Sequence, residues 1–426
     1  MQSNAVRMFP TLCLLKPIVT KRNGAPVKND HWLFVTLCIA ANLVITLPAI
    51  AQDAANGDTI RIATFNCSLN RDKSGDLLRD LQSGNNKQAR EVAAILRTVR
   101  PDIVLLNEFD YDSADASIDA FRKDYLEATG DWTSQPALKL QHAYSGPVNT
   151  GVPSGLDLDH DGKTDGWGDA FGFGRFPGQY GMVILSRFPI DAAAARSFQN
   201  LLWKNMPISA VPADITSGAE PWYSESDLAT LRLSSKSHWD VPVNIGDKTL
   251  HVLVSHPTPP AFDGPEDRNG RRNHDEIRLW AEYLSDQQIG WLTDDKGVSG
   301  GLPSDALFVI LGDQNADPND GNSFSGAIDL LLKHPRIDAS HIPTSQGGVE
   351  ATKTQGKINI RHKGDPSHDT SDFSDGSVGN LRADYVLPSR GLDVRAAHIF
   401  WPKKGEPGAD LVECSDHRLV WIDVAF

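Results

Sequence analysis

The sequence predicts one domain of mixed helices and strands, and three observations lead to this prediction. Short apolar runs with the length and alternation of β-strands recur along the chain, and segments with helical spacing separate several of them. Polar and acidic residues follow directly after many of these runs. No internal repeat and no change in composition marks a second domain after the N-terminal segment. We therefore expect a single folded domain over residues 52–426.

Residues 1–51 have the order of a secretory signal, in which basic residues precede an apolar run and small residues mark the cleavage position. The apolar run covers residues 32–47, and small residues lead to Ala51 before Gln52. The alternative is an uncleaved membrane anchor, but the run is shorter than the ~20 residues of a spanning helix and contains Asn42. We expect a signal peptide that is cleaved near Ala51–Gln52, and a mature protein that is secreted or periplasmic.

The chain of 426 residues is acidic, with a formal net charge of −14 and 40% hydrophobic residues. Removal of residues 1–51, which hold five basic residues and one acidic residue, would leave 36 Lys and Arg against 54 Asp and Glu, a net charge of −18. This charge disfavours non-specific binding to nucleic acid through phosphate neutralisation and suits a protein that recruits divalent cations. Two cysteines, Cys67 and Cys414, would remain. Export permits a disulfide between them, and two separate buried thiols fit equally well.

Two predicted strands near the N-terminus end in polar residues. Residues 59–69 alternate between apolar and polar side chains, and Asn66 closes the alternating run. Residues 102–110 are continuously apolar until Glu108, and a helix over residues 89–99 separates the two strands. This strand–helix–strand order would bring Asn66 and Glu108 to two strand ends.

The remaining elements follow in chain order. Apolar runs predict strands and helical periodicity predicts helices, while segments rich in Gly, Ser and Asp are expected to form loops. The expected elements are a loop at 70–87, an irregular segment at 111–178, a strand at 180–190, a segment without clear assignment at 200–238, a strand at 248–260, an Arg-rich loop at 262–276, a helix through Trp280 and Leu284, a strand at 306–311, a helix at 318–334, a long surface loop at 340–380, a strand at 381–389 and a last strand that opens at Ser415–His417.

The stretch 306–320 holds the most concentrated set of polar residues at a strand end. A buried strand over residues 306–311 stops at Gly312, and Asp313 and Asn315 follow. Positions i and i+2 of a strand face the same side, so Asp313 and Asn315 would point together into one pocket. The alternative is a capped strand end with the hydrogen bonds of an Asx turn.

A second acidic stretch resembles the first half of a calcium-binding loop. Asp157, Asp159 and Asp161 alternate, a glycine follows, and Asp165 comes later. Alternating carboxylates of this kind wrap a calcium ion, and the glycine permits the tight turn. The acidic residue expected at the twelfth position is absent, because Gly168 stands there. The sequence therefore leaves open a structural Ca²⁺ site or a solvated acidic turn.

The polar residues at strand ends have the types that phosphoester hydrolysis requires. Carboxylate and amide oxygens suit Mg²⁺ or Mn²⁺. A carboxylate can orient and deprotonate water, and a histidine held by a carboxylate can stabilise a developing oxyanion. The sequence has no Cys/His cluster for zinc, no G-x-S-x-G turn and no phosphate-binding G-x-x-x-x-G-K-[ST] loop. The set comprises Asn66, Glu108, His256, Asp313, Asn315, Asp384, Asp416 and His417.

Six short motifs, TFN, LLNE, SHPTPP, GDQNAD, RADYVLPS and CSDH, follow one another in an order that resembles the endonuclease/exonuclease/phosphatase superfamily. This superfamily includes pancreatic-type deoxyribonuclease, neutral sphingomyelinases and inositol-polyphosphate phosphatases. The resemblance runs from about residue 59 to the C-terminus, with insertions at 111–178, 200–240 and 340–380. It implies an α+β fold, a four-layer α/β/β/α sandwich of two mixed β-sheets flanked by helices.

The resemblance also implies a role for each residue around a catalytic Mg²⁺ or Mn²⁺. Glu108 would be the main metal ligand with Asn66 beside it, and Asp416 would lie at the edge of the metal site. Asp313 would position or deprotonate the attacking water, and Asn315 would bind the scissile phosphate.

The two histidines would act on the phosphoryl group. By resemblance, His417 would stabilise its developing charge and would be oriented by Asp384, and His256 would be a second catalytic histidine. The sequence offers no evident carboxylate partner for His256. Gln314 departs from the family pattern, which often has an aromatic or apolar residue there. Three arginines that follow His256 could bind a second phosphate or a headgroup, or belong to a solvated loop; they are Arg268, Arg271 and Arg272.

These expectations describe an exported, metal-dependent phosphoesterase that hydrolyses a phosphodiester or phosphomonoester by in-line attack of an activated water. The substrate would be a small diester, a phospholipid headgroup, a sugar phosphate or nucleic acid, because one fold serves many substrates. We expect a monomer with no obligate protein partner. An extracellular nuclease of the same superfamily is one alternative. A non-catalytic, calcium-stabilised binding module is another, although such a relic would be expected to have lost part of the catalytic set, and no residue of the set is missing.

Overall fold

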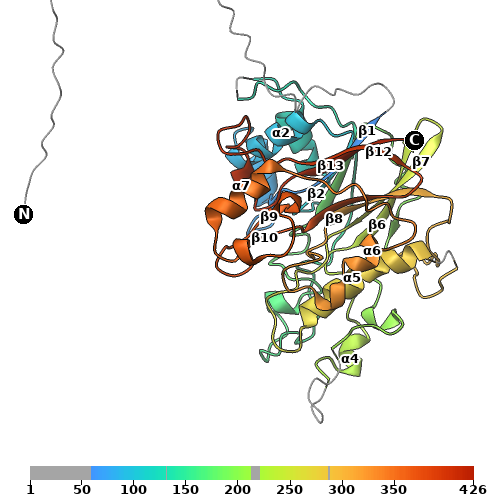
Figure 1. Cartoon of the computed structure of the whole chain (residues 1–426). Helices are drawn as coiled ribbons and strands as arrows, with labels where there is room; N and C mark the ends of the chain where they lie inside the picture. Colours follow the sequence, from blue (N-terminus) through green and yellow to red (C-terminus); the bar gives the residue numbers. More distant parts are fainter. Residues whose placement is uncertain (1–58, 131, 213–220, 286–287) are drawn as a thin grey trace, which may run out of the picture. The chain divides into compact units, whose positions relative to one another are not determined.

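The computed structural model describes residues 59–426 except residues 131, 213–220 and 286–287 (Figure 1). The expected signal peptide and its cleavage position near Ala51–Gln52 therefore lie outside the described residues. Within the described part of the chain, no helix is both long and apolar enough to cross a membrane.

The first sheet has six strands in the order β12-β13-β1-β2-β4-β3. Neighbouring strands are antiparallel except for β1 and β2, which are parallel, so the sheet is mixed. Its strands are β1 (Ile60–Asn66), β2 (Ile103–Asn107), β3 (His142–Ser145), β4 (Met182–Ser186), β12 (Asp393–Ile399) and β13 (Val420–Ala425).

The second sheet has five strands in the order β11-β8-β7-β6-β5, and it is also mixed, because β7 and β8 are parallel. Two short strands, β9 and β10, form a separate antiparallel pair. The strands outside the first sheet are β5 (Arg196–Ser197), β6 (His238–Ile245), β7 (Lys248–Ser255), β8 (Leu307–Asp313), β9 (Ser371–Asp372), β10 (Asn380–Leu381) and β11 (Asp384–Pro388).

The two sheets pack face to face, and helices cover their outer faces (Figure 1). Ile62 and Ile184 of the first sheet share one buried cluster with Val252 and Val309 of the second. The expected four-layer α+β sandwich is thus confirmed. Its helices are α1 (Asp76–Gln82), α2 (Lys87–Val99), α3 (Ala116–Phe121), α4 (Glu225–Leu228), α5 (Arg268–Ser285), α6 (Asp329–Leu332) and α7 (Gln346–Gln355), with short helical turns at 122–126, 167–169, 203–205, 324–326, 359–361, 366–368 and 412–414.

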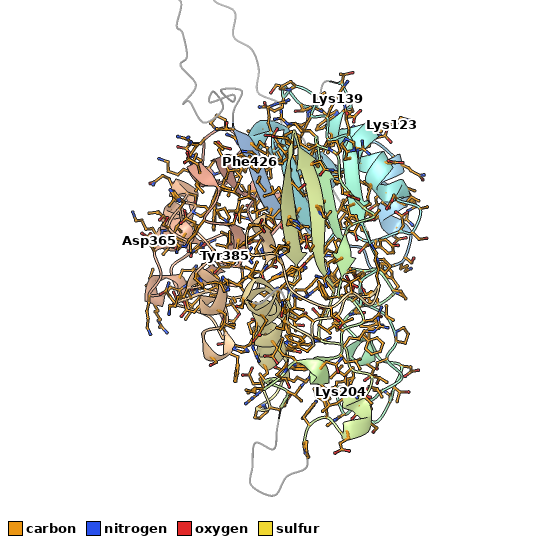
Figure 2. All side chains as sticks on the ribbon, turned by 90° about the vertical axis from the view of Figure 1, so that its right-hand side faces the viewer. Lys123, Lys139, Lys204, Asp365, Tyr385 and Phe426 are labelled. Carbon is orange, nitrogen blue, oxygen red and sulfur yellow. The ribbon has the colours of Figure 1, made fainter. Side chains whose placement is uncertain are left out.

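The strands are apolar on both faces because each face meets another layer. On β8, Val309 contributes to the core between the sheets, whereas Phe308 and Ile310 contribute to the core beneath the helices. Trp280 of α5 and Tyr385 of β11, which is labelled in Figure 2, belong to this second core. This double burial explains why the central strands appear in the sequence as unbroken apolar runs.

Several sequence-based expectations about helices were wrong. The expected loop at 70–87 contains α1, and the expected Arg-rich loop at 262–276 already belongs to α5 from Arg268 onward. The expected helix at 318–334 is reduced to a helical turn at 324–326 and the single turn of α6, and Ser325 within the first of these turns has a left-handed backbone with φ 51°. The expected loop at 340–380 contains α7.

Helix α7 was not predicted because its first turn contains two glycines, and close packing explains why glycine stands there. Gly347 and Gly348 stand in its first turn, where glycine normally weakens a helix. A Cβ at Gly347 would lie 2.2 Å from the carbonyl oxygen of Trp401, and a Cβ at Gly348 would lie 2.4 Å from that of Pro366. Ser345 caps the helix by accepting a hydrogen bond from the backbone of Gly348. The glycines therefore permit tight packing that no local pattern reveals.

Cys67 and Cys414 are both buried free thiols, so the disulfide alternative does not hold in this structure. Burial raises the pKa of the Cys414 thiol to about 12. Two separate buried thiols, the other alternative from the sequence, describe these residues.

Candidate active site

The predicted polar residues gather where strands of both sheets end. Asn66 is the last residue of β1, and Glu108 directly follows β2, its parallel neighbour. Asp313 is the last residue of β8 and Asp384 the first of β11, and the antiparallel register pairs these two residues directly. Because the sheets face each other, these ends form one polar site at one edge of the sandwich.

Asn66 connects the two carboxylates from opposite sheets. Its Nδ2 lies 3.1 Å from Glu108 Oε1 and 3.1 Å from Asp313 Oδ2, and Asn66 is fully buried. Glu108 has a left-handed backbone, with φ 59°, because the chain turns sharply after β2. Asn70, which the sequence analysis did not identify, donates a hydrogen bond of 2.7 Å to Glu108 Oε2. The glutamate is thus oriented by two amides.

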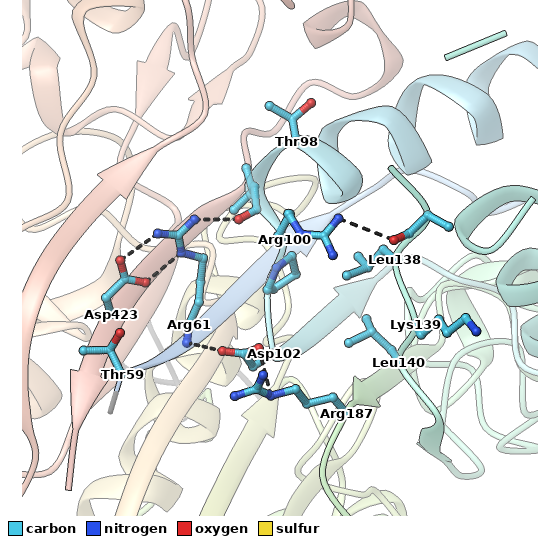
Figure 3. A pocket seen from close by; sticks show the side chains of 13 residues that line it. Thr59, Arg61, Thr98, Arg100, Asp102, Leu138, Lys139, Leu140, Arg187 and Asp423 are labelled. Atoms are coloured by element: carbon cyan, nitrogen blue, oxygen red, sulfur yellow. Dashed lines mark hydrogen bonds and ion pairs between the residues drawn. The ribbon is translucent and has the colours of Figure 1, made fainter. Parts of the chain in front are cut away.

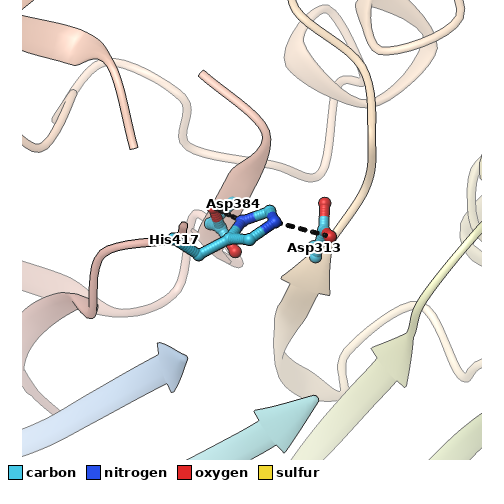
Figure 4. A group of neighbouring side chains, drawn as sticks. All are labelled: Asp313, Asp384 and His417. Carbon is cyan, nitrogen blue, oxygen red and sulfur yellow. Dashed lines mark hydrogen bonds and ion pairs between the residues drawn. The ribbon is translucent and has the colours of Figure 1, made fainter. Parts of the chain in front are cut away.

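His417 lies between two buried aspartates (Figure 4). Its Nδ1 is 2.8 Å from Asp384 Oδ2, and its Nε2 is 3.5 Å from Asp313 Oδ2. Thr370 donates a second hydrogen bond to Asp384 Oδ2 at 2.8 Å. Phe373 packs edge-on against the imidazole, with ring centroids 5.2 Å apart. These contacts fix the ring between the two carboxylates.

The charges of this group follow from its contacts. Burial lowers the pKa of His417, but Asp384 and Asp313 raise it more strongly, to about 10. Burial raises the pKa of Asp384 to about 6, against the lowering effect of His417. Burial also disfavours ionised Asp313, yet His417 and the hydrogen bond from His256 hold its pKa well below the usual range. At neutral pH, an imidazolium therefore stands between two carboxylates.

His256 has the carboxylate partner that the sequence could not supply. Its Nε2 lies 3.4 Å from Asp313 Oδ2, so both histidines converge on one carboxylate oxygen. Burial, followed by the charge of Lys236, lowers the pKa of His256, so this ring is neutral at pH 7. The two site histidines thus differ in charge.

Asn315 lies beside Asp313, but the predicted reason was wrong. Strand β8 ends at Asp313, and Asn315 has a left-handed backbone with φ 50° rather than a strand conformation. Its backbone N donates to Asp313 Oδ1 at 2.9 Å, which is the Asx turn of the alternative interpretation. Its Nδ2 donates to the carbonyl oxygen of Pro257 at 3.1 Å. A turn, not strand alternation, brings the two residues together.

Asp416 stands at the rim of the site and is exposed. Ser68 Oγ donates to its Oδ1 at 3.3 Å, and the backbone N of Ser68 donates to Asn66 Oδ1 at 3.3 Å. Asp416 therefore approaches the site through Ser68, and its contact with a metal stays a prediction.

Two donor sets could hold a divalent cation. Asp313, Asp384 and His417 offer ligand atoms within 4.8 Å of one another, but His417 already forms a hydrogen bond to Asp384 and an ion-pair contact of 3.5 Å with Asp313. Glu108 offers carboxylate oxygens, and Asn66 would offer its amide oxygen after rotation of the side chain, because its Nδ2 now faces Glu108 and Asp313 while its Oδ1 accepts from the backbone of Ser68. The second set fits Mg²⁺ or Mn²⁺ better, because it requires no loss of a proton from His417.

In the acidic loop, the carboxylates that lie close together are not the four that the sequence predicted. Asp157, Asp159 and Asp169 place carboxylate oxygens within 4.8 Å of one another, while Asp161 and Asp165 are exposed and lie outside this trio. The chain returns through a helical turn at 167–169 that supplies Asp169, which the simple alternating pattern could not anticipate. Calcium binding stays a prediction for this corrected set.

The three arginines after His256 have structural partners, which favours a structural role over the alternative of a phosphate clamp. The side chain of Arg272 is buried and donates to the carbonyl oxygens of Phe171, Arg232 and Leu233. Arg268 pairs with Glu266 and lies over the ring of Trp222. Arg271 donates to the carbonyl oxygen of Glu266 and lies over Phe324.

Helix α5 anchors the loops that carry the site, a function that its polar sequence concealed. Glu276 accepts hydrogen bonds from the backbone N of Ser235 at 2.6 Å and of Thr258 at 2.6 Å. Asn273 donates to the carbonyl oxygens of Thr258 at 2.8 Å and Gln314 at 2.9 Å. The bonded residues are close in sequence to Lys236, His256 and Asp313. Helix α5 therefore fixes the relative positions of the three segments that carry these side chains.

A cavity of about 510 Å³ lies away from this site, at the opposite ends of β1 and β2 (Figure 3). Arg61 forms two 2.7 Å contacts with Asp423, and Asp102 accepts a 2.8 Å hydrogen bond from the backbone of Arg61. Arg187 forms an ion pair of 3.0 Å with Asp102. None of the predicted site residues lines this cavity, and its central charges neutralise one another.

Comparison with known proteins finds one matching family model and several solved structures with a similar fold. A model described as "Endonuclease/Exonuclease/phosphatase family" matches residues 63–417. A crystal structure of an endonuclease/exonuclease/phosphatase from Beutenbergia cavernae is 17% identical, with a TM-score of 0.46, and the match covers 87% of this chain and 72% of that chain. Sphingomyelinase C from Streptomyces griseocarneus is 16% identical over 86% of this chain and 99% of that chain, with a TM-score of 0.39. The human Nocturnin catalytic domain is 12% identical over 87% and 94%, with a TM-score of 0.41. No curated protein sequence matches.

Proposed function

The chain belongs to the endonuclease/exonuclease/phosphatase family, and on this premise we propose that it is an exported, metal-dependent phosphoesterase. The reaction is hydrolysis of a phosphodiester or phosphomonoester by in-line attack of an activated water. The convergence of Asn66, His256 and His417 on Asp313 Oδ2 is the observation that carries this proposal. Three nitrogen groups around one ionised carboxylate oxygen form a preorganised polar site, as phosphoryl transfer requires.

Asp313 is the residue that orients the attacking water. It is ionised at neutral pH, because His417 and His256 stabilise its charge. A carboxylate of this kind would orient the water by accepting a hydrogen bond from it, and its low pKa suits this positioning role better than removal of a proton. Asn315 is held against Asp313 by the turn, and its Nδ2, which donates one hydrogen to the carbonyl oxygen of Pro257, would donate the other to the phosphoryl group.

His417 is the donor to the negative charge that develops on the phosphoryl oxygens. Its imidazolium form persists at neutral pH because Asp384 and Asp313 raise its pKa. Asp384 fixes the ring orientation through the 2.8 Å contact with Nδ1, which leaves Nε2 directed toward Asp313 and the reacting group. His256 lies on the other side of Asp313 as a neutral donor.

Glu108 and Asn66 are the ligands that we propose for Mg²⁺ or Mn²⁺, with Asp416 at the edge of the site. A bound cation would offset the negative charge of the phosphoryl group and its leaving oxygen. Asn70 keeps the Glu108 carboxylate in place for this purpose. The second proposed ion, a structural Ca²⁺, would lie at Asp157, Asp159 and Asp169.

The order of basic, apolar and small residues in 1–51 supports export, with processing near Ala51–Gln52. N-terminal sequencing of the protein recovered outside the cytoplasm tests this proposal. A start near Gln52 is expected, and an intact N-terminus on membrane-bound protein would contradict it. The proposed mature protein is a monomer.

The activity test uses residues 52–426 stripped of metal. Hydrolysis of a chromogenic phosphodiester, its matching monoester, a phospholipid with a phosphate headgroup and plasmid DNA is measured with Mg²⁺, Mn²⁺ or Ca²⁺ returned singly. Metal-dependent turnover of one of these esters is expected. A steep fall of DNA cleavage with added salt would identify the nuclease alternative, and no turnover of any ester with any metal would contradict the proposal.

A further inference from the structure

Lys236 is a buried lysine at the candidate active site that the mechanism above does not use. It stands two residues before β6, which begins at His238. His238 pairs with Ser255, the last residue of β7, so the start of β6 lies beside the end of β7 that carries His256. Only 7% of the surface of Lys236 is exposed. Topology therefore places a lysine at the same sandwich edge as the catalytic set.

Among the residues that the structure describes, no hydrogen bond or ion pair joins the Lys236 ammonium to another side chain or to the backbone. It nevertheless feels the charges of Glu276, Glu108 and Asp313, which favour its protonated form against the larger opposing effect of burial. Nζ is not among the fully buried, unpartnered polar atoms of the described residues, so it stays accessible although most of the side chain is buried, and a charged group in such surroundings favours an anionic partner. Such a group is expected to have an anionic partner that is absent from the protein chain itself.

The neighbouring carboxylates are already occupied by other donors. Glu276 accepts hydrogen bonds from Ser235 through one oxygen and from Thr258 through the other. Glu108 accepts from two asparagine amides. The oxygens of Asp313 are engaged by Asn66, the two histidines and the backbone of Asn315. The ammonium is thus near negative charge and is free to contact a ligand.

Electrostatic balance also requires a positive group at this position. Glu108, Asp313 and Asp384 bring three carboxylates to the site, and His417 neutralises one of them. Two carboxylate charges therefore remain, and they would repel an entering phosphoryl anion. One divalent cation would cancel these two charges but would leave none to attract the anion. A fixed ammonium at this edge of the sandwich, near the end of β7 that carries His256, would favour entry of the anion.

We propose that Lys236 contacts the substrate directly and binds a non-bridging oxygen of its phosphoryl group through Nζ. This inference rests on the proposed function and adds a second cationic contact, besides His417, to the phosphate-binding part of that site. Helix α5 positions the lysine indirectly, because Glu276 holds the backbone of the preceding residue, Ser235.

The test compares wild-type protein with Lys236→Met, which keeps the length of the side chain and removes its charge. Binding of inorganic phosphate is measured by calorimetry at saturating Mg²⁺, and the affinity is expected to fall about ten- to hundredfold, as for loss of a hydrogen bond to a charged group. Lys236→Arg is expected to recover most of the affinity. Lys333→Met is the matched control, because the Lys333 side chain is 76% exposed on α6's C-terminal side, and no change is expected there.

Three further readouts separate this contact from a structural role. Mn²⁺ affinity, measured by electron paramagnetic resonance, is expected to stay within about twofold of wild type, as is the thermal unfolding midpoint of Lys236→Arg. If Lys236→Met does not fold, Lys236→Gln and Lys236→Arg are compared in the same phosphate titration. Unchanged phosphate affinity in a folded charge-removing variant would overturn the inference, even if turnover fell. Absence of turnover in wild type would instead count against the proposed function.

Discussion

Asp384 stands directly opposite Asp313 on adjacent antiparallel strands, and the imidazole of His417 lies between their carboxylates. The contact of His417 with Asp384 is 2.8 Å and that with Asp313 is 3.5 Å. The shorter contact with Asp384 orients the imidazole ring. The longer contact with Asp313 leaves Nε2 able to donate a hydrogen bond to a substrate oxygen. Strand register thus determines how the histidine is charged and directed.

Replacement of Asp384 by Asn is expected to lower the pKa of His417, because Asp384 is the largest influence that raises it above its usual value. Nitrogen-15 NMR of the imidazole measures the change directly. In wild type, protonated His417 is expected up to a pH of about 10, and in Asp384→Asn the transition moves toward neutral pH. We also expect kcat to fall about hundredfold or more, in line with loss of an orienting carboxylate. An unchanged titration in the variant would show that Asp384 does not set the charge of His417.

The same shift has a consequence for stability. The folded-state pKa of His417 lies above the value of about 6.5 for an unfolded histidine. The stabilisation that this shift provides is therefore complete below about pH 6.5 and is lost as the pH rises toward about 10. Urea unfolding of wild type and His417→Asn across this window is expected to give a stability difference that shrinks with rising pH.

Asn70→Ala is expected to weaken metal binding without unfolding the protein. Its amide donates the 2.7 Å hydrogen bond that orients Glu108, the proposed main ligand. Loss of such a supporting contact typically reduces metal affinity about 10–100-fold. Titration with Mn²⁺ measures the affinity, and Asn200→Ala, at an exposed position, is the control. Equal affinities in Asn70→Ala and wild type would place the metal elsewhere.

Glu276→Gln is expected to destabilise the fold and loosen the site. The carboxylate is fully buried and accepts hydrogen bonds from two backbone N–H groups and one serine hydroxyl. Loss of charge-assisted contacts at such a position costs about 1–3 kcal/mol. Urea unfolding provides the measurement, with Glu282→Gln on the same helix as control, because that side chain is half-buried, 30% exposed, and pairs with Arg278 rather than with a loop backbone. Equal effects of the two substitutions would argue against an anchoring role for Glu276.

Calcium is expected to raise the unfolding temperature of wild-type protein through the loop of Asp157, Asp159 and Asp169. Asp159→Asn is expected to abolish the increase, since it removes one carboxylate charge from the trio. Asp165→Asn is expected to leave the increase intact, because Asp165 is exposed and outside the trio. Scanning calorimetry with and without Ca²⁺ makes the comparison. The opposite pattern would restore the set predicted from the alternating sequence.

The strand ends could be predicted because each couples a local apolar run to a polar residue that terminates it. Asn66, Glu108 and Asp313 follow this rule, whereas Asp384 opens its strand, and the structure brings all four residues together. The conformation after β8 could not be predicted in this way, since the turn at Asn315 depends on a hydrogen bond to Asp313.

The supporting residues have no local signature. Lys236, Glu276 and Thr370 resemble ordinary polar residues in the sequence, and their importance comes only from what the fold places beside them. Helix α5 illustrates the difficulty, because its buried polar side chains, which the sequence analysis assigned to a loop, anchor other loops. Asn70 lies four residues after Asn66, in a segment expected to be a loop, and only its contact with Glu108 reveals its position.

Asp313 is the residue on which the proposed chemistry depends most directly. The decisive measurement is the rate of ester hydrolysis by metal-stripped wild type and Asp313→Ala, each with Mg²⁺ or Mn²⁺ returned, with Asp329→Ala as a control for charge loss at an exposed ion pair. We predict metal-dependent turnover in wild type and the control, and a loss of at least about a thousandfold in Asp313→Ala. Activity that survives in folded Asp313→Ala would contradict the account.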